Sequence, residues 1–558
     1  MPAPRPAIAH RASTRPTRAL SRRHALRLTT AAALGTAAFP FILRSAPAPA
    51  SPPGHVIGEP TADKVGQQIL ASGGNAIDAI VAAALAAAVA APNQTGIGGY
   101  GMSATIALAG GRQIVSIDGN STAPAALRPD AFPPGPDGKV PGRVNESGWL
   151  AAGVPGVLAG LHLALEKFGT RPFSELLQPA IAIARNGFPW PKGLADVIAQ
   201  QKLFATDPGS RKLFFPDGQP LAPGALFKNP ELAELLTTLA KANSIEPFYR
   251  GDLAQRIAEG FQKNGGLVTA QDLAAHRARV VEPLTFTWGA HTIHTAPLTA
   301  GGLTVLQILR AMHALNWDKL PAGLARTHAR LEAARLAWRD RLTLLGDPDF
   351  GKIPGARLLS ADYARESAEK ITAAIKAGKP LAHAVTPRPQ NGTISLSAAD
   401  QLGNFVALTL THGEAFGARV TVAGLGLTLG HGMSRFDPNP AHPNAPGPGK
   451  RPLHNMVPTI VTRDGTPVLA IGGRGGRKIP NALLDVLTHY VVLGQPLASA
   501  MAAPRFHTDG TTAVSFEKSW PAEETDALAK LGYKVNSGTS ANLSAVALTP
   551  DGLIKSQR

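Results

Sequence analysis

The 558-residue sequence contains no cysteine. Disulfides, thiolate metal sites and a cysteine nucleophile are therefore excluded, and any nucleophile must be an oxygen. Acidic residues are also scarce, 38 against 55 lysines and arginines, and the formal net charge is +17. Residues 1–50 hold eight arginines and no lysine, aspartate or glutamate, so +17 less 8 leaves +9 for the rest. Because that excess is spread out, we expect no nucleic-acid partner.

The N-terminal segment is typical of an export signal. Arg22 and Arg23 precede a modest apolar stretch over residues 28–43, and small residues at A-x-A spacing follow at 46–50. This order resembles a twin-arginine signal peptide, and the apolar stretch is too short to span a bilayer. We predict that residues 1–50 are the signal, that the protein is periplasmic or secreted, and that it has no stable membrane anchor. An uncleaved anchor or a disordered tail is the alternative.

The rest of the chain has a globular composition, 44% hydrophobic and 17% charged over the whole sequence. Residues 61–91 predict two alanine-rich helices broken at a glycine pair, the second of them buried. A long amphipathic helix is expected over residues 331–345. Residues 376–392 are typical of an exposed linker, and the pattern beyond them becomes strand-like.

Two strand-like segments follow the linker, residues 393–397 and 405–411, and both alternate polar with apolar side chains. A three-residue loop that ends on Gly403 in the left-handed conformation would join them as a hairpin. Thr393 then lies directly opposite Thr411, close enough for the two hydroxyls to meet.

The same alternation places Thr393, Ser395 and Ser397 on one face of the first strand. A polar face that begins at a threonine predicts the floor of an active site.

Two glycine-rich segments have competing interpretations. Residues 96–101 match the dinucleotide pattern G-x-G-x-x-G. A helix is expected before them and a strand after them, the reverse of the required order, so a tight turn is the better interpretation. Residues 471–478 have three interpretations: a phosphate cradle, an ordinary loop, or a source of backbone N–H groups for an oxyanion near Thr393. They lack the Lys-Ser/Thr ending of a P-loop. The sequence leaves these three open.

Seven short motifs occur in order along nearly all of the chain beyond residue 50. They are GGNAIDA at 73–79, GIGG at 96–99, GVPG at 153–156, LGDPDF at 345–350, GKRPL at 449–453, PTI at 458–460 and APRFH at 503–507. Together they resemble the gamma-glutamyltranspeptidase family. The resemblance implies an α+β fold, a four-layer αββα sandwich of the N-terminal-nucleophile hydrolase type. It also implies self-cleavage into a large subunit, residues 51–392, and a small catalytic subunit, residues 393–558, which associate as a heterodimer.

The resemblance assigns roles to five residues. Cleavage falls between Gly392 and Thr393, and Thr393 is the nucleophile. Thr411 matches the second threonine that hydrogen-bonds the nucleophile, and Gly475 and Gly476 match the oxyanion-hole pair. The α-amine freed by cleavage has a pKa near neutrality and suits a general base. The expected partners are a small-molecule amide or gamma-glutamyl-like substrate and water or an amine acceptor, with no cofactor.

Several positions that bind glutamate in the family are changed here. Asn120 stands where a carboxylate-binding arginine is usual, and Arg435 stands where an acid faces the substrate amine. His454 and Asn455 replace a serine pair, and Gly413 replaces an asparagine. A substrate ammonium beside Arg435 would be repelled, so we expect altered acyl-group specificity.

Three histidines, His412, His431 and His454, border the pocket by resemblance. Their spacing matches no zinc signature, so a polar lining is expected rather than a metal site. The leading hypothesis is a self-processing amidohydrolase/acyltransferase that acts through an acyl-enzyme on Thr393. A cephalosporin or glutaryl-type acylase, which Arg435 favours, is one alternative. A non-catalytic binding protein on the same fold is another.

Overall fold

The structure, a computed structural model, describes residues 53–383, 385, 387 and 392–558. The predicted signal peptide, residues 1–50, lies outside this part, so its export role stays a prediction. Among the described residues, no helix is both long enough and apolar enough to cross a membrane.

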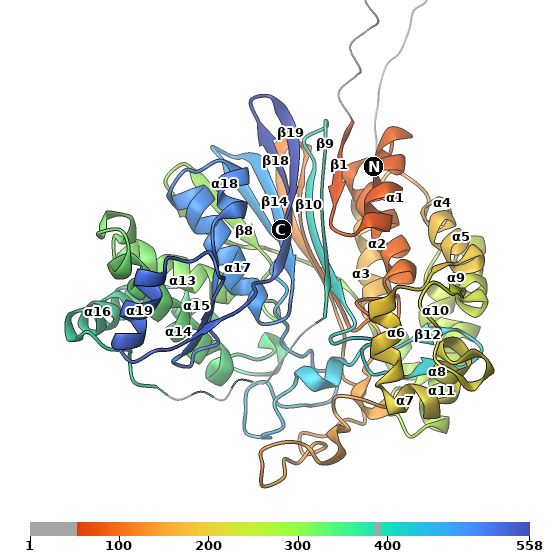
Figure 1. The fold of residues 1–558 in the computed structure, drawn as a ribbon. Helices are drawn as coiled ribbons and strands as arrows, with labels where there is room; N and C mark the ends of the chain where they lie inside the picture. The colour runs from red at the N-terminus through yellow and green to blue at the C-terminus, as the bar shows by residue number, and fades with distance from the viewer. Residues whose placement is uncertain (1–52, 384, 386, 388–391) are drawn as a thin grey trace, which may run out of the picture. The chain divides into compact units, whose positions relative to one another are not determined.

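Two six-stranded antiparallel sheets pack face to face (Figure 1). The first sheet has the order β1 (Gly54–Ile57), β9 (Ile394–Asp400), β10 (Phe405–Thr411), β2 (Gly101–Leu108), β3 (Gln113–Asn120) and β6 (Arg279–Val281). The second has the order β19 (Gly552–Gln557), β18 (Asn542–Thr549), β14 (Thr466–Arg474), β13 (Thr459–Arg463), β8 (His291–Thr295) and β7 (Leu284–Trp288). Strands β9 and β10 contact β14 across the interface.

Helices cover the outer face of each sheet (Figure 1). The first sheet is covered by α1 (Pro60–Ala71), α2 (Ala76–Ala90) and α3 (Val157–Phe168), with α5 (Gln178–Asn186) and α9 (Pro230–Ala242) beyond them. The second is covered by α13 (Gly302–Ala314) and α17 (Lys478–Leu487), with α14 (Leu324–Leu344) and α16 (Ala361–Ala377) packed on α13. The layers are therefore α, β, β, α, and the predicted α+β sandwich is confirmed.

The helix pair predicted over residues 61–91 is present as α1 and α2. Fourteen of the fifteen residues of α2 are buried, because it packs between the first sheet and helices α3 and α5. Its one carboxylate, Asp78, accepts hydrogen bonds from the backbone N–H groups of Asn75 (2.9 Å) and Thr170 (2.8 Å). The buried charge is thus satisfied by the ends of neighbouring segments.

Helix α14 differs from the prediction in both length and character. It begins at Leu324, seven residues before the predicted start, and it is buried on nearly every side rather than amphipathic. Its arginines are buried with partners: Arg330 pairs with Asp485 at 3.2 Å, and Arg335 pairs with Glu332. These ion pairs allow a charged helix to be buried, and the sequence of the helix alone does not indicate which residues will pair with its charges.

The hairpin of β9 and β10 has the predicted register. Ile394 pairs with Leu410 and Ala399 with Phe405, and Gly403 has a φ of +79°. The side chain of Asp400 accepts from the backbone N–H of Asn404 (3.0 Å) and from that of Ala76 (2.8 Å), the first residue of α2. The loop is therefore held by its own residues and tied to a helix N-terminus.

The polar face of β9 proves to be an inter-sheet contact beyond its first residue. Ser397 donates to the carbonyl of Ser544 (2.9 Å), and the Ser544 hydroxyl donates to Ser395 Oγ (3.2 Å). Both serines are buried by β18 of the second sheet. The prediction of an extended active-site floor is wrong for these two residues, because β9 is central in its sheet and the second sheet covers it.

Residues 96–101 form the tight turn expected between α2 and β2, not a nucleotide loop. A Cβ atom at Gly99 would lie 2.8 Å from the carbonyl oxygens of both Gly96 and Thr411. Only glycine allows this turn to approach the end of β10 so closely.

Candidate active site

Thr393 lies directly before β9 and is 5% exposed. It opens on a small cavity lined by Tyr100, Gly392, Thr393, Arg435, Asn455, Met456, Gly476 and Ile479. The structure therefore gathers residues that flank strand ends of both sheets, together with one residue of η7 (Gly432–Arg435) and one of α17, around the predicted nucleophile. Five of the predicted site residues line this cavity: Gly392, Thr393, Arg435, Asn455 and Gly476.

The two predicted threonines and Gly392 form one hydrogen-bond network. Thr411 Oγ1 donates to the carbonyl oxygen of Gly392 (2.8 Å) and accepts from the backbone N–H of Gly413 (2.8 Å). Thr393 Oγ1 lies 3.3 Å from Thr411 Oγ1 and also contacts the carbonyl oxygen of Gly392. The predicted contact between the two hydroxyls is therefore present, and both are directed at the peptide bond that precedes Thr393.

Gly392 adopts a backbone conformation that side chains disfavour, with a φ of +84°. A Cβ atom there would lie 2.3 Å from the carbonyl oxygen of Gly413. A glycine is thus required on both conformational and steric grounds, and it holds its carbonyl beside the two hydroxyls.

The glycine pair directly follows β14, and one residue, Arg477, separates it from helix α17. Gly475 and Gly476 have φ values of +136° and +61°, and Gly476 lines the cavity with Thr393. Within the described residues, neither backbone N–H donates a hydrogen bond to the protein. Of the three interpretations left open by the sequence, the position beside Thr393 favours the oxyanion role.

Arg435 ends the short η7 helix (Gly432–Arg435) and is 7% exposed. Its Nη2 donates to His431 Nε2 at 3.1 Å, and its guanidinium lies 5.8 Å from the centre of the Tyr100 ring. Neither partner is charged, so the positive charge stays available to the cavity.

His431 occupies the space that a side chain at position 413 would fill. A Cβ on Gly413 would lie 2.1 Å from His431 Nε2. The backbone N–H of Glu414 also donates to Nε2 (2.7 Å), so the proton must be on Nδ1, which donates to the carbonyl of Glu146 (2.8 Å). Burial, and then the charge of Arg435, holds the pKa of His431 well below its usual value. His431 is therefore a neutral acceptor for Arg435.

The remaining predicted substrate-binding positions have structural contacts. Asn120 ends β3, two strands from Thr411, but its amide donates to Thr299 Oγ1 and to the carbonyl of Pro452, both at 2.7 Å. His454 is buried, and its carbonyl accepts from Arg341 (2.6 Å). Asn120 and His454 are thus absent from the cavity lining beside Thr393.

Three histidines predicted as polar lining are all buried. Burial lowers the pKa of His412 to about 3 and, with the charges of Arg341 and Arg435, that of His454 to about 3. They are neutral near pH 7 and add no positive charge. Within the described ranges, no group of three or more His, Cys, Asp or Glu side chains is placed to hold a metal ion.

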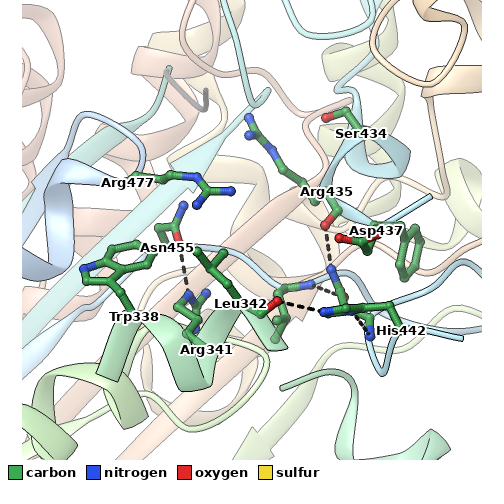
Figure 2. A pocket seen from close by; sticks show the side chains of 12 residues that line it. Trp338, Arg341, Leu342, Ser434, Arg435, Asp437, His442, Asn455 and Arg477 are labelled. Carbon is green, nitrogen blue, oxygen red and sulfur yellow. Dashed lines mark hydrogen bonds between the residues drawn. The ribbon is translucent and has the colours of Figure 1, made fainter. Parts of the chain in front are cut away.

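A second cavity adjoins the first at Arg435 and Asn455, which line both. Figure 2 shows it, with Arg341, Arg477 and Trp338 on one side and Arg435 on the other. The sequence patterns predicted no role for Arg341 or Arg477. The position of Arg477 directly after the glycine pair could have placed it near the site from the sequence. No sequence pattern indicates that Arg341, buried on α14, lies near the site.

Comparisons with known proteins agree with this geometry. A family model described as Gamma-glutamyltranspeptidase matches residues 62–556. The glutathione hydrolase proenzyme of Pseudomonas sp. (strain A14) is 36% identical over 509 residues, which cover 88% of this chain and 83% of that protein. The acylase ACY 1 proenzyme of Pseudomonas sp. (strain V22) is 34% identical over 509 residues, 89% of this chain and 90% of that protein. The crystal structure of cephalosporin acylase from Bacillus halodurans matches with a TM-score of 0.79 and 26% identity, covering 92% of this chain and 96% of that one. The chain therefore belongs to the gamma-glutamyltranspeptidase family, and like its relatives it is an enzyme.

Proposed function

We propose that the protein is a precursor that cuts itself between Gly392 and Thr393 and then uses Thr393 as an N-terminal nucleophile. The observation that carries this is the contact of both threonine hydroxyls with the Gly392 carbonyl. The Thr393 hydroxyl attacks the carbonyl carbon of Gly392, and Thr411 stabilises the oxyanion that forms. Collapse breaks the C–N bond and places a proton on the departing nitrogen. This collapse frees the α-amine of Thr393 and leaves the Gly392 acyl group as an ester on its hydroxyl. Water then hydrolyses the ester, which frees the hydroxyl and leaves a carboxylate on Gly392.

The two fragments, residues 51–392 and 393–558, would stay associated. Strands β9 and β10 of the small fragment lie between β1 and β2 of the large one. In the second sheet, β13 of the small fragment pairs with β8 of the large one. Cleavage at position 392 therefore cuts no strand and leaves both interleaved sheets intact, which favours a heterodimer.

In turnover, the freed α-amine of Thr393 would act as the general base for its own hydroxyl. The hydroxyl attacks the carbonyl of an amide substrate, and the N–H groups of Gly475 and Gly476 receive the oxyanion. The amine leaves with a proton, and water or an acceptor amine attacks the acyl-enzyme. Hydrolysis and transfer are two exits from the same intermediate.

The test is a denaturing gel of purified protein with N-terminal sequencing of the smaller band. Two fragments are expected, the smaller starting Thr-Ile-Ser-Leu, and Thr393→Ala should remain one chain. A wild-type chain that stays intact after long incubation would refute the proposal of self-cleavage. It would favour the alternative of a non-catalytic binding protein on the same fold.

We further propose that the acyl group carries a carboxylate but no α-ammonium, as in a glutaryl-type acylase. Arg435 lines the cavity beside Thr393, and at about 4 Å it would repel an ammonium by about 4 kcal/mol at an effective dielectric near 20. Relatives named as glutathione hydrolase and as acylase are about equally similar to this chain. Paired glutaryl and γ-glutamyl anilides, which differ only in the amino group, decide between the two. A clear preference for the γ-glutamyl donor refutes this assignment, and Arg435→Asp should shift preference toward it.

For localisation, we propose export by the twin-arginine route from the pair Arg22 and Arg23. Replacing both with lysine should leave the precursor in the cytoplasm. Export that continues unchanged when the twin-arginine pathway is removed would exclude this route.

A further inference from the structure

The cavity that adjoins the nucleophile is unusual in its charge. Of the residues that the structure describes, three arginines line it, Arg341, Arg435 and Arg477, together with one carboxylate, Asp437. In Figure 2 the side chains of Arg435 and Arg477 enter from opposite sides of the view, with Arg341 below Asn455. Like charges placed together in a buried space are costly unless an anion joins them.

Two of the three arginines have only neutral partners among the described residues. Arg341 donates to the carbonyl of His454 (2.6 Å) and to Asn455 Oδ1 (3.3 Å). Burial, and after it the charge of Arg477, lowers the pKa of Arg341 to about 9. Arg435 contacts His431 and Tyr100, as described above.

Two carboxylates that line a neighbouring cavity together with Arg435 are already paired with other arginines. Glu146 forms an ion pair with Arg143, and Glu414 lies 3.5 Å from Arg419. They therefore leave the charge of Arg435 largely uncompensated on the cavity side.

Arg477 is held in place rather than loosely exposed. It is 9% exposed, and its guanidinium lies 5.8 Å from the centre of the Trp338 ring. The indole N–H of Trp338 donates to Asn481 Oδ1 (3.0 Å), which fixes the ring. Arg477 also precedes the first residue of α17, whose N-terminal dipole adds positive potential at the same point.

We propose that this cavity is a second anion subsite of the acyl pocket, so that the preferred acyl group carries two carboxylates at the end remote from the scissile carbonyl. The acyl carbonyl sits at Thr393, the chain passes Arg435 and Asn455, and the two carboxylates meet Arg435 and Arg477. This inference rests on the proposed function, since it takes the cavity beside Thr393 as the acyl site. It goes further in naming a dianionic acyl group.

Binding to the uncleaved Thr393→Ala protein tests the subsite without any turnover. The probes are glutarate and propane-1,1,3-tricarboxylate, which differ by one carboxylate on the carbon that bears the amine in glutamate. By calorimetry, the tricarboxylate should bind at least tenfold more tightly, and the difference should shrink as salt is added. Equal affinity for the two probes overturns the inference, and this comparison needs no further variant.

Substitutions then locate the second carboxylate. In the same background, Arg477→Gln should remove the tenfold advantage while glutarate still binds, and Arg477→Lys should keep part of it. Arg365→Gln is the matched control, because that arginine is exposed on α16 and its loss removes the same charge. A tenfold advantage that survives Arg477→Gln in a protein with an unchanged melting temperature refutes the assignment of Arg477.

Kinetics on the mature enzyme separate this inference from the proposed function. The donors are three anilides, γ-glutamyl, glutaryl and 4,4-dicarboxybutanoyl, in which ammonium is replaced by hydrogen and then by carboxylate. The inference predicts that kcat/KM rises in that order. Failure of the wild type to cleave at Thr393 would count against the proposed function alone, since the binding comparison would still stand or fall by itself.

Discussion

Removing the hydroxyl of Thr411 should slow self-cleavage with little change to the fold. Thr411→Val keeps the shape and the β-branched side chain, which suits a buried central strand. It deletes the donor that lies 2.8 Å from the carbonyl oxygen of Gly392. It also deletes the acceptor for the backbone N–H of Gly413.

The size of the effect follows from what that donor does. During attack by Thr393, negative charge develops on the Gly392 oxygen, and among the described side chains Thr411 donates to that oxygen besides the nucleophile itself. Loss of one oxyanion-hole donor typically costs about 100- to 1000-fold in rate. The buried N–H of Gly413 would lose its acceptor, which lowers the free energy of unfolding by about 1–3 kcal/mol. The rate should therefore fall far more than the melting temperature.

The assay is a time course on denaturing gels from freshly purified precursor. Thr411→Ser is the matched control, because it retains the hydroxyl and should cleave within about tenfold of wild type, well above the valine variant. Thr393→Ala sets the uncleaved baseline. If Thr411→Val matures within about threefold of the wild-type rate, the Thr411 hydroxyl does not stabilise the oxyanion, and the reasoning from the 2.8 Å contact is wrong.

Three further changes probe the surroundings of the site. Gly392→Ala should block or greatly slow maturation, since its Cβ would lie 2.3 Å from the carbonyl oxygen of Gly413; normal two-band gels would contradict this. His431→Leu removes the acceptor that holds Arg435, so KM for a glutaryl anilide should rise about tenfold or more, while kcat and self-cleavage change little. His431→Gln, which can still accept a hydrogen bond, should have a smaller effect. An unchanged KM would show that His431 does not position the arginine. His454 has a folded pKa of about 3, below its unfolded value near 6.5, so it contributes stability that is present above pH 6.5 and lost as pH falls toward 3. Urea unfolding at pH 7 and pH 5 should show that His454→Gln reduces the fall in the free energy of unfolding by up to about 1.4 kcal/mol per pH unit. If wild type and variant lose stability equally between the two pH values, His454 does not contribute to the pH dependence.

The sequence predicted the catalytic hairpin well because its determinants are local. Strand alternation and one glycine set the register of β9 against β10, so the contact of Thr393 with Thr411 could be derived from residue spacing alone. The burial of α2 was likewise readable from a continuous run of apolar residues. The four-layer arrangement came from the family resemblance rather than from these local patterns.

Features that depend on tertiary packing could not be derived in this way. The face of β9 that carries Ser395 and Ser397 is polar, yet it lies between the two sheets, and nothing local indicates that a second sheet will cover it. The sequence pattern predicts an amphipathic helix where the buried helix α14 lies, because the partners that neutralise its charges are distant in sequence, as with Arg330 and Asp485. Arg341 was missed for the same reason.

The chemistry and the specificity proposed for this site lie on separate parts of the fold. The groups around the Gly392 carbonyl are hydroxyls and backbone groups on two paired strands, where register leaves little freedom. Arg435 instead lies on the short η7 helix, and His431 and Arg477 lie on segments between regular elements, where substitution is tolerated more readily than in a central strand. The ring of His431 fills the space that a side chain at position 413 would need, and it holds the guanidinium of Arg435. Changes at these positions can therefore redirect Arg435 without moving Thr393 or Thr411. Such an arrangement would let one nucleophile serve acyl groups that differ in charge, because the residues proposed to select the acyl group are not those proposed to break the bond.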